Sequence, residues 1–346
     1  MREIDIKVFG LPSELHEFVR VDYSLAQALL VEKTKAHLLP AALTPEQHSL
    51  VNGVEVATQE YFAVKMHRLG IPENLISPLP NVQYAISQPD GKSRGDYNSA
   101  HDMPVVYVDG FIANGSRNFF DVLSTIVHEL GHASVNQELR FYFSEDPEGF
   151  EGIIPAIGLE AIGNRKLKAT GIEEGMVLFD EVDFFNTYLK KMFPKEYAKR
   201  YKWSKGSFVV DHVARLLNLP IEYTSLTPFL RESGHAFPII GDFFQKTLIN
   251  SLTMFKEYMF TKKLCEIVGR NSVGQGEKID AEEAIQYGHD ILDRDRYIRS
   301  HQAHRAIVHA LGGKNAKAIF QLKAHDKEHI DEAMKILMGT DGENAV

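Results

Sequence analysis

The chain has 346 residues, and 47 acidic against 38 basic side chains give a formal net charge of −9 at pH 7. This length exceeds the usual limit for one core, so we expect one large domain with a satellite, or two domains. The acidic balance argues against nucleic acid or an anionic membrane as the main partner. The sole cysteine, Cys265, excludes an internal disulfide framework. Neither a signal peptide nor a long apolar run is found, so we expect a cytoplasmic protein without a membrane partner.

Residues 1–100 are expected to form the N-terminal α/β part of the catalytic unit. Residues 4–9 alternate charged and apolar side chains, which predicts a strand. Thr44-Pro45-Glu46-Gln47 combines a capping residue, a first-turn proline and an acid, so a helix is expected from there to about residue 68. Apolar and β-branched runs predict two further strands, at residues 82–87 and 103–108.

The most informative stretch is His128-Glu129-Leu130-Gly131-His132. Apolar residues before it recur at helical spacing from Phe119 onward, which predicts that the stretch lies on a helix. Residues four apart lie on the same side of a helix, so His128 and His132 can bind one metal ion together. Glu129 is then placed to act on water at that ion. This pattern is the His-Glu-x-x-His signature of zinc hydrolases.

A catalytic zinc site usually has three protein ligands, so a third ligand is needed. A histidine six residues after His132 is absent, because position 138 is a glutamate. The other common solution is a glutamate on a later helix. Glu174, followed by Gly175, begins an apolar helical stretch, and Glu181 lies two turns later on the same face. From there Glu181 can orient a ligand histidine.

At these positions the chain resembles the gluzincin metallopeptidases, whose zinc site combines His-Glu-x-x-His with a glutamate on a downstream helix. The resemblance covers roughly residues 100–190. It implies that His128, His132 and Glu174 bind Zn²⁺, and that Glu129 is the general base. The gap of 41 residues between His132 and Glu174 is longer than in the gluzincin aminopeptidases, whose Gly-Ala-Met-Glu-Asn signature is also absent. The resemblance therefore supports the broader zinc-peptidase class rather than aminopeptidase activity.

Glu173 and Glu160 are alternatives for the third ligand. Glu173 is adjacent to Glu174 and faces about 100° away on the same helix. An acid at a helix start is favoured by the helix dipole, so Glu173 fits the description of a solvated side chain. Glu160 follows Pro155, which can open a helix, but no second acid follows it at helical spacing. Glu174 is therefore preferred.

The expected mechanism follows from the ion. Zinc lowers the pKa of bound water to about 7, and Glu129 takes the water proton and passes it to the departing amine. The oxyanion then needs a second electrophile beside the metal, usually a tyrosine or histidine. His235, in a glycine-containing loop, is the first candidate for this catalytic role. Three further candidates stay open: Tyr201, His212 and Tyr223.

The rest of the chain divides into a zinc-binding core at residues 101–200 and a helical C-terminal subdomain at 201–346. His325 and His329 have metal-ligand spacing, but the charged residues around them indicate a solvated face. Helical periodicity is found in four further segments, near residues 205–218, 240–268, 280–296 and 315–338.

These features predict an α+β, predominantly helical protein. We expect a zincin-like catalytic domain with a small mixed sheet and an active-site helix, plus a helical C-terminal part. The leading hypothesis is a zinc-dependent metallopeptidase that acts on a peptide or protein substrate. Two alternatives stay open: a zinc hydrolase of a non-peptide amide or ester, and a binding protein that retains the fold without turnover.

Overall fold

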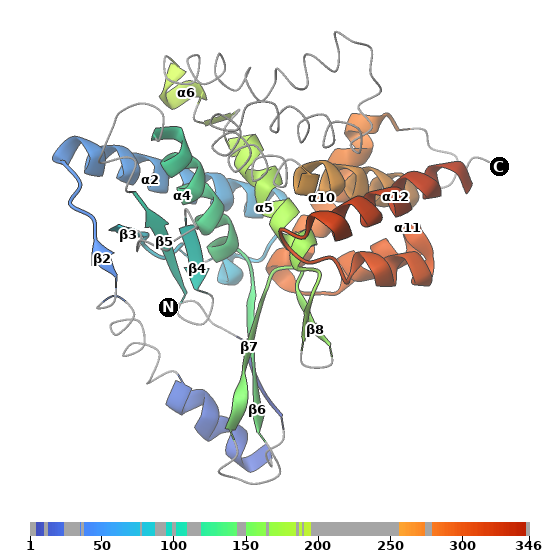
Figure 1. Cartoon of the computed structure of the whole chain (residues 1–346), viewed down its shortest axis with the longest axis horizontal. Helices are drawn as coiled ribbons and strands as arrows, with labels where there is room; N and C mark the ends of the chain where they lie inside the picture. The colour runs from blue at the N-terminus through green and yellow to red at the C-terminus, as the bar shows by residue number, and fades with distance from the viewer. Residues whose placement is uncertain are drawn as a thin grey trace, which may run out of the picture.

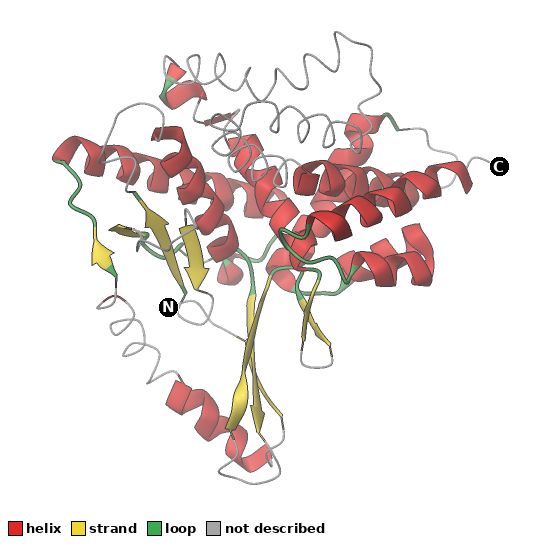
Figure 2. Cartoon of the chain, viewed as in Figure 1, coloured by secondary structure: helices red, strands yellow, loops and turns green. Residues whose placement is uncertain are grey.

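A computed structural model describes most of the chain outside residues 195–255. The described ranges are 5–9, 13–23, 35, 38–76, 78–86, 95–98, 102–108, 119–143, 150–163, 166–184, 187–188, 190–194, 256–273 and 279–343. Within them the fold is α+β, with many helices and three small sheets (Figures 1 and 2). The predicted fold class is confirmed at this level.

Helix α2 (Pro45–Arg68) begins where its sequence predicts. The backbone N–H of Gln47 donates to Thr44 Oγ1 at 3.3 Å, and the N–H of Thr44 donates to Gln47 Oε1 at 2.8 Å. This capping box and the first-turn proline fix the start of the helix. Val54 and Phe62 are fully buried, so one face of α2 belongs to the core.

A four-stranded mixed sheet lies beside α2 (Figure 1). Its strands, in spatial order, are β2 (Leu39–Pro40), β3 (Gln83–Ile86), β5 (Met103–Tyr107) and β4 (Gly95–Asn98). β3 and β5 are parallel, whereas β2 and β4 are antiparallel to their neighbours. Helix α4 (Phe119–Ser134) packs on β4 and β5 and against α2, burying Leu123, Ile126 and Leu130 completely. The strands predicted at residues 82–87 and 103–108 are confirmed as β3 and β5, and the helix predicted from Phe119 onward is confirmed as α4.

A second sheet extends from the main group of helices toward the N-terminal helix at residues 16–23 (Figure 1). It consists of β1 (Asp5–Phe9), β6 (Gln137–Phe143) and β7 (Phe150–Ile157), with β6 in the centre, parallel to β1 and antiparallel to β7. Pro155 lies in β7 opposite Leu139 and opens no helix, so that prediction is wrong. Among the described strands β7 has a neighbour on one side only, where the missing N–H of a proline is tolerated. A short hairpin, β8 (Ala161–Gly163) and β9 (Lys166–Lys168), follows.

The described residues from 256 onward are mostly helical and have their own core. Their elements are the helix at residues 256–272, α10 (Ala281–Ile298), α11 (Gln302–Ile319) and α12 (Lys327–Glu343). Helix α5 (Thr170–Phe184) connects the two halves, because Ile172 and Met176 join the C-terminal core while Phe184 joins the core of α2 and α4. Other described helical segments are Ser13–Leu15, the helix at residues 16–23, Glu73–Leu75 and α6 (Lys190–Met192).

The predicted C-terminal helices agree with the structure in part. The helix expected at 280–296 is α10. The single helix expected at 315–338 is wrong, because the chain turns between α11 and α12. The helix expected at 205–218 and the first part of that at 240–268 lie outside the described residues. None of the helices in the described ranges has the length and apolarity needed to cross a membrane.

Candidate metal centre

His128 and His132 project from the same side of α4, one turn apart. Their ring centroids are 4.9 Å apart, and the ring planes are inclined at 82°. Both side chains are largely buried, with 13% and 12% of their surface exposed. Apolar packing of Leu123 and Ile126 fixes the helix from its other faces. The two imidazoles are therefore held in position by the core rather than by a mobile loop.

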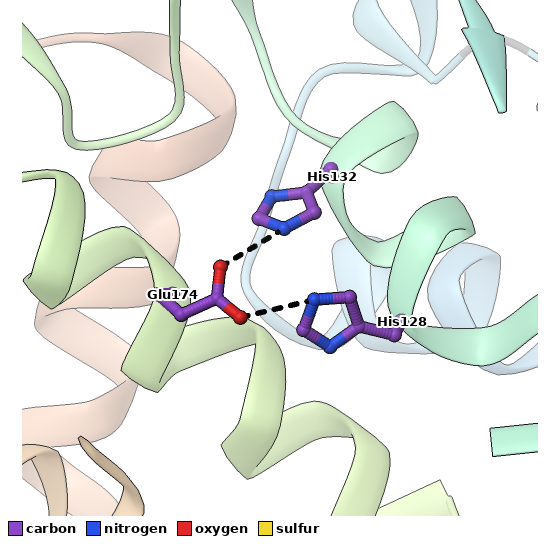
Figure 3. Close-up of side chains that lie close together, drawn as sticks. All are labelled: His128, His132 and Glu174. Atoms are coloured by element: carbon purple, nitrogen blue, oxygen red, sulfur yellow. Dashed lines mark ion pairs between the residues drawn. The ribbon is translucent and has the colours of Figure 1, made fainter. Parts of the chain in front are cut away.

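Glu174 reaches both imidazoles from α5 (Figure 3). Its Oε1 lies 3.1 Å from His128 Nε2, and its Oε2 lies 3.3 Å from His132 Nε2. Burial alone would raise the pKa of the Glu174 carboxyl, but the charges of the two histidines hold it well below its usual range. Two nitrogen atoms and one carboxylate thus converge on one point, where positive charge is stabilised.

Two glycines let neighbouring helices approach α5 closely beside Glu174. A Cβ on Gly131 of α4 would lie 3.0 Å from Val177 Cγ1. A Cβ on Gly175 would lie 2.9 Å from the backbone oxygen of Glu257, in the helix at residues 256–272. Larger residues would push these helices apart, so the Glu174-Gly175 pair in the sequence has a packing reason.

Glu181 lies behind His128. Its Oε2 is 3.4 Å from His128 Nδ1, and the hydroxyl of Ser124 donates a hydrogen bond to its Oε1. Burial disfavours a charged imidazole, yet Glu174 and Glu181 together hold the pKa of His128 well above its usual value. Nδ1 of His128 thus faces one carboxylate and Nε2 faces another, an arrangement that can orient a ligand histidine.

Glu129 lies beside the two histidines and is 6% exposed. Burial raises the pKa of its carboxyl to about 7, a rise that the charges of His128 and His132 oppose. Strand β4 passes directly against it, since a Cβ on Gly95 would lie 2.5 Å from Glu129 Oε1. A carboxyl with a pKa near neutrality can both accept and donate a proton at physiological pH.

The alternatives for the third ligand point elsewhere. Glu173 is 1% exposed, and its carboxylate accepts hydrogen bonds from Arg296 Nη2 at 2.7 Å and from the backbone N–H of Leu159 at 2.8 Å. The prediction of a solvated Glu173 is therefore wrong, because its partner lies 123 residues away in the sequence. Glu160 accepts a hydrogen bond from the backbone N–H of Ile157 at 2.9 Å and is outside the cluster of His128, His132 and Glu174.

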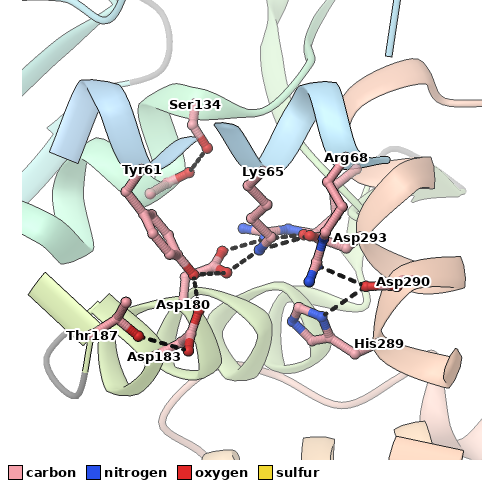
Figure 4. A network of polar contacts seen from close by, with 12 residues as sticks. Tyr61, Lys65, Arg68, Ser134, Asp180, Asp183, Thr187, His289, Asp290 and Asp293 are labelled. Atoms are coloured by element: carbon pink, nitrogen blue, oxygen red, sulfur yellow. Dashed lines mark hydrogen bonds and ion pairs between the residues drawn. The ribbon is translucent and has the colours of Figure 1, made fainter. Parts of the chain in front are cut away.

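Arg296 also belongs to a buried network that joins α2, α5 and α10, in which Lys65, Asp180 and Asp293 lie close together (Figure 4). Arg296 Nη1 lies 2.8 Å from Asp180 Oδ2 and 2.9 Å from Asp293 Oδ1. Lys65 pairs with Asp180 and, at 2.6 Å, with Asp293. Because Lys65 forms ion pairs with both aspartates, Asp180 and Asp293 require no metal ion as a counter-charge.

Another histidine approaches the candidate site from the C-terminal helices. His325 Nε2 is 3.9 Å from Glu174 Oε1, and His325 Nδ1 is 3.5 Å from Glu257 Oε2. The sequence predicts a solvated face here, and the His325 side chain is 62% exposed; it precedes α12, which begins at Lys327, and lies beside Glu174. The i, i+4 spacing to His329 was the only local signal, and it has no structural meaning, since His329 Nδ1 pairs with Asp326 at 2.7 Å.

The proposed electrophile His235 and its alternatives Tyr201, His212 and Tyr223 lie outside the described residues. The structure therefore brings together His128, His132 and Glu174, with Glu129 and Glu181 beside them.

The cluster of His128, His132 and Glu174 fits a divalent cation. One ligand atom from each residue lies within 4.8 Å of the others. Two imidazole nitrogens and a carboxylate oxygen are a donor set of catalytic zinc sites, in which a fourth position stays open. Comparisons of the chain with protein-family models, curated proteins and solved structures found no match, so the interpretation of this site depends on its own residues.

Proposed function

We propose that this chain is a zinc-dependent metallopeptidase of gluzincin type. The observation that carries the proposal is the convergence of two imidazoles and one carboxylate, with Glu174 at 3.1 Å from His128 and 3.3 Å from His132. His128, His132 and Glu174 would hold the zinc ion. The helix α4 that carries both histidines packs on a small mixed sheet, and helices form the other half, which supports a zincin-like arrangement.

The zinc ion, when bound, polarises the scissile carbonyl and lowers the pKa of water at the site. Glu129 then accepts a proton from the attacking water and donates it to the departing amine. Its burial and its pKa of about 7 suit both steps. Glu181 keeps the ring of His128 oriented through Nδ1, at 3.4 Å.

Strand β4 supports a peptide as the substrate. Within the described residues it is an outer strand of its sheet, and it passes against Glu129 at Gly95. An outer strand offers backbone N–H and C=O groups that can bind an extended peptide by β-addition. Tyr97 of the same strand stacks on His132, with ring centroids 6.4 Å apart, so the strand and the metal ligands form one surface.

The experiment combines zinc analysis with digestion of a peptide library. Wild-type protein should bind zinc and cleave peptides in a chelator-sensitive way. Glu129→Gln should keep the zinc and lose at least ~100-fold in rate, because a general base contributes that much. Glu160→Gln is the matched control: it removes a half-buried carboxylate outside the cluster and should leave cleavage unchanged.

The outcomes separate the alternatives. No bound zinc in the wild type would refute the metal site. If the protein binds zinc and hydrolyses small amide or ester substrates but not peptides, it is a zinc hydrolase of non-peptide substrates. Bound zinc without turnover of either substrate class would indicate a binding protein. Full activity in Glu129→Gln would remove this residue from the chemistry.

A further inference from the structure

We propose that Glu174, Glu257 and His325 form a second divalent-cation site beside the first, with Glu174 as the shared carboxylate. This inference depends on the proposed function, since both sites use Glu174. The three residues come from α5, the helix at residues 256–272 and the turn before α12. One ligand atom from each lies within 4.8 Å of the others.

The helix at residues 256–272 delivers Glu257 to this position. Because Gly175 has no side chain, the backbone of this helix at Glu257 can lie directly against α5, next to Glu174. The side chain of Glu257 is fully buried. Its Oε1 accepts a hydrogen bond from the backbone N–H of His325 at 2.5 Å, but its Oε2 accepts none from the described residues. A buried carboxylate oxygen without a hydrogen bond is costly unless a cation or a proton satisfies it.

His325 faces the same point from solvent. Its side chain is 62% exposed, so an ion can reach the site. Its backbone adopts φ = 59°, a left-handed conformation that is uncommon for residues other than glycine. The hydrogen bond to Glu257 holds this conformation. Strain of this kind persists where surrounding contacts determine it, and it is concentrated at ligand-binding positions.

The distances favour ligands of one ion over direct hydrogen bonds. His325 Nδ1 is 3.5 Å from Glu257 Oε2, and His325 Nε2 is 3.9 Å from Glu174 Oε1. Both separations are long for a hydrogen bond. Ligand atoms about 2.1 Å from a tetrahedral ion lie ~3.4 Å from one another, which is close to the first separation. His325 would offer one of its ring nitrogens, after a small rotation of its exposed ring.

The position of the buried carboxylates also favours a second cation. Glu129, Glu174 and Glu257 are three buried carboxylates within this region. Glu257 is outside the cluster of His128, His132 and Glu174, so an ion held by that cluster alone would leave the Glu257 carboxylate without a metal partner. Paired ions roughly 3.5–4 Å apart are a known arrangement for amide and ester hydrolysis, in which both ions stabilise the developing charge.

The test is the metal content of the full chain after removal of metal and reconstitution with Zn²⁺. We expect about two ions per chain in the wild type and about one in His325→Ala and in Glu257→Gln. His325→Ala changes an exposed side chain, so it is informative even if the buried Glu257→Gln fails to fold. His329→Ala is the matched control and should keep both ions. With Mn²⁺, spin coupling between neighbouring ions should be seen in the wild type and lost in His325→Ala.

The failure of this proposal is distinguishable from that of the first site. One ion in the wild type, retained in His325→Ala and lost in His128→Ala, would overturn the second site and leave the first. If the wild type and His325→Ala each bind about one ion but His325→Ala does not cleave peptides, His325 contacts the substrate instead of a metal ion. This result would also overturn the second site. Absence of metal from the wild type would overturn both sites.

Discussion

Replacing Arg296 by methionine should severely destabilise the protein. The Arg296 guanidinium is fully buried and bonds three carboxylates, those of Glu173, Asp180 and Asp293. Arg296→Met keeps an apolar stem of similar length but removes the ion pair of Glu173 and leaves Lys65 as the ion-pair partner of Asp180 and Asp293 among the described residues. Removing one partner of a buried ion pair costs ~3–5 kcal/mol. We expect at least that loss in the free energy of unfolding, a large part of the ~5–15 kcal/mol typical of a domain.

Urea denaturation of wild type and variant, followed by circular dichroism, measures this loss. Arg270→Met is the matched control, because Arg270 is 44% exposed and pairs with Glu266 on its own helix. The control should change the free energy of unfolding by less than ~0.5 kcal/mol. A loss below ~1 kcal/mol in Arg296→Met would refute the reasoning, since it would mean that the three carboxylates need no counter-charge.

The pH dependence of the same experiment gives a second check. Burial alone would raise the pKa of Asp293, but the charges of Lys65, His289 and Arg296 hold it below its usual range. A lowered pKa in the folded state contributes stability above the ordinary value of about 4, and this contribution is lost as the pH falls through the folded pKa. The difference between wild type and Arg296→Met should therefore be largest at neutral pH and smaller in acid.

Three further predictions follow from single residues. Glu174→Gln should lower zinc affinity at least ~10-fold, whereas Glu173→Gln should keep zinc bound and lose ~1–3 kcal/mol of stability; equal zinc affinities would exclude Glu174 as a ligand. Burial raises the pKa of the Glu160 carboxyl from 4.5 to about 8. Between these two pH values the unfolded state loses this proton while the folded state keeps it, so the free energy of unfolding falls as the pH rises. Glu160→Gln should consequently gain ~1–3 kcal/mol over wild type at pH 9 and little at pH 4, and a pH-independent difference would contradict this. Gly288→Ala should cost ~2–4 kcal/mol in chemical denaturation, because its Cβ would collide with the backbone of Cys265; an unchanged midpoint would show that the helices can separate.

Local signals explain which parts of the fold could be predicted. The start of α2 depends on Thr44, Pro45 and Gln47, which interact within four residues, so the sequence contains the whole cause. Pro155 shows the opposite case. A proline suits a first helical turn and an outer strand equally, and the choice was made by pairing with β6, which no local pattern reveals.

The candidate site was predictable to the same extent. His128 and His132 are fixed relative to each other by one helical turn, so their convergence follows from the sequence. Glu174 required a choice between neighbours, and the burial of Glu173 against Arg296 is the long-range contact that local reasoning could not supply. The charged neighbours of His325 correctly predicted an exposed side chain, but its approach to Glu174 depends on the turn before α12, 151 positions along the chain, and no local pattern reveals it.

The N-terminal part of α5 carries Glu173 and Glu174 on different sides, which has a consequence for metal exchange. The Arg296 ion pair anchors this part of α5 from inside the protein, independently of any ion at Glu174. The carboxylate proposed to bind the metal is thus preorganised before an ion arrives. Chelation should then empty the centre without unfolding the chain, and repeated cycles of depletion and reloading should be reversible. Such behaviour would differ from that of small zinc domains, in which the metal itself supplies the folding energy.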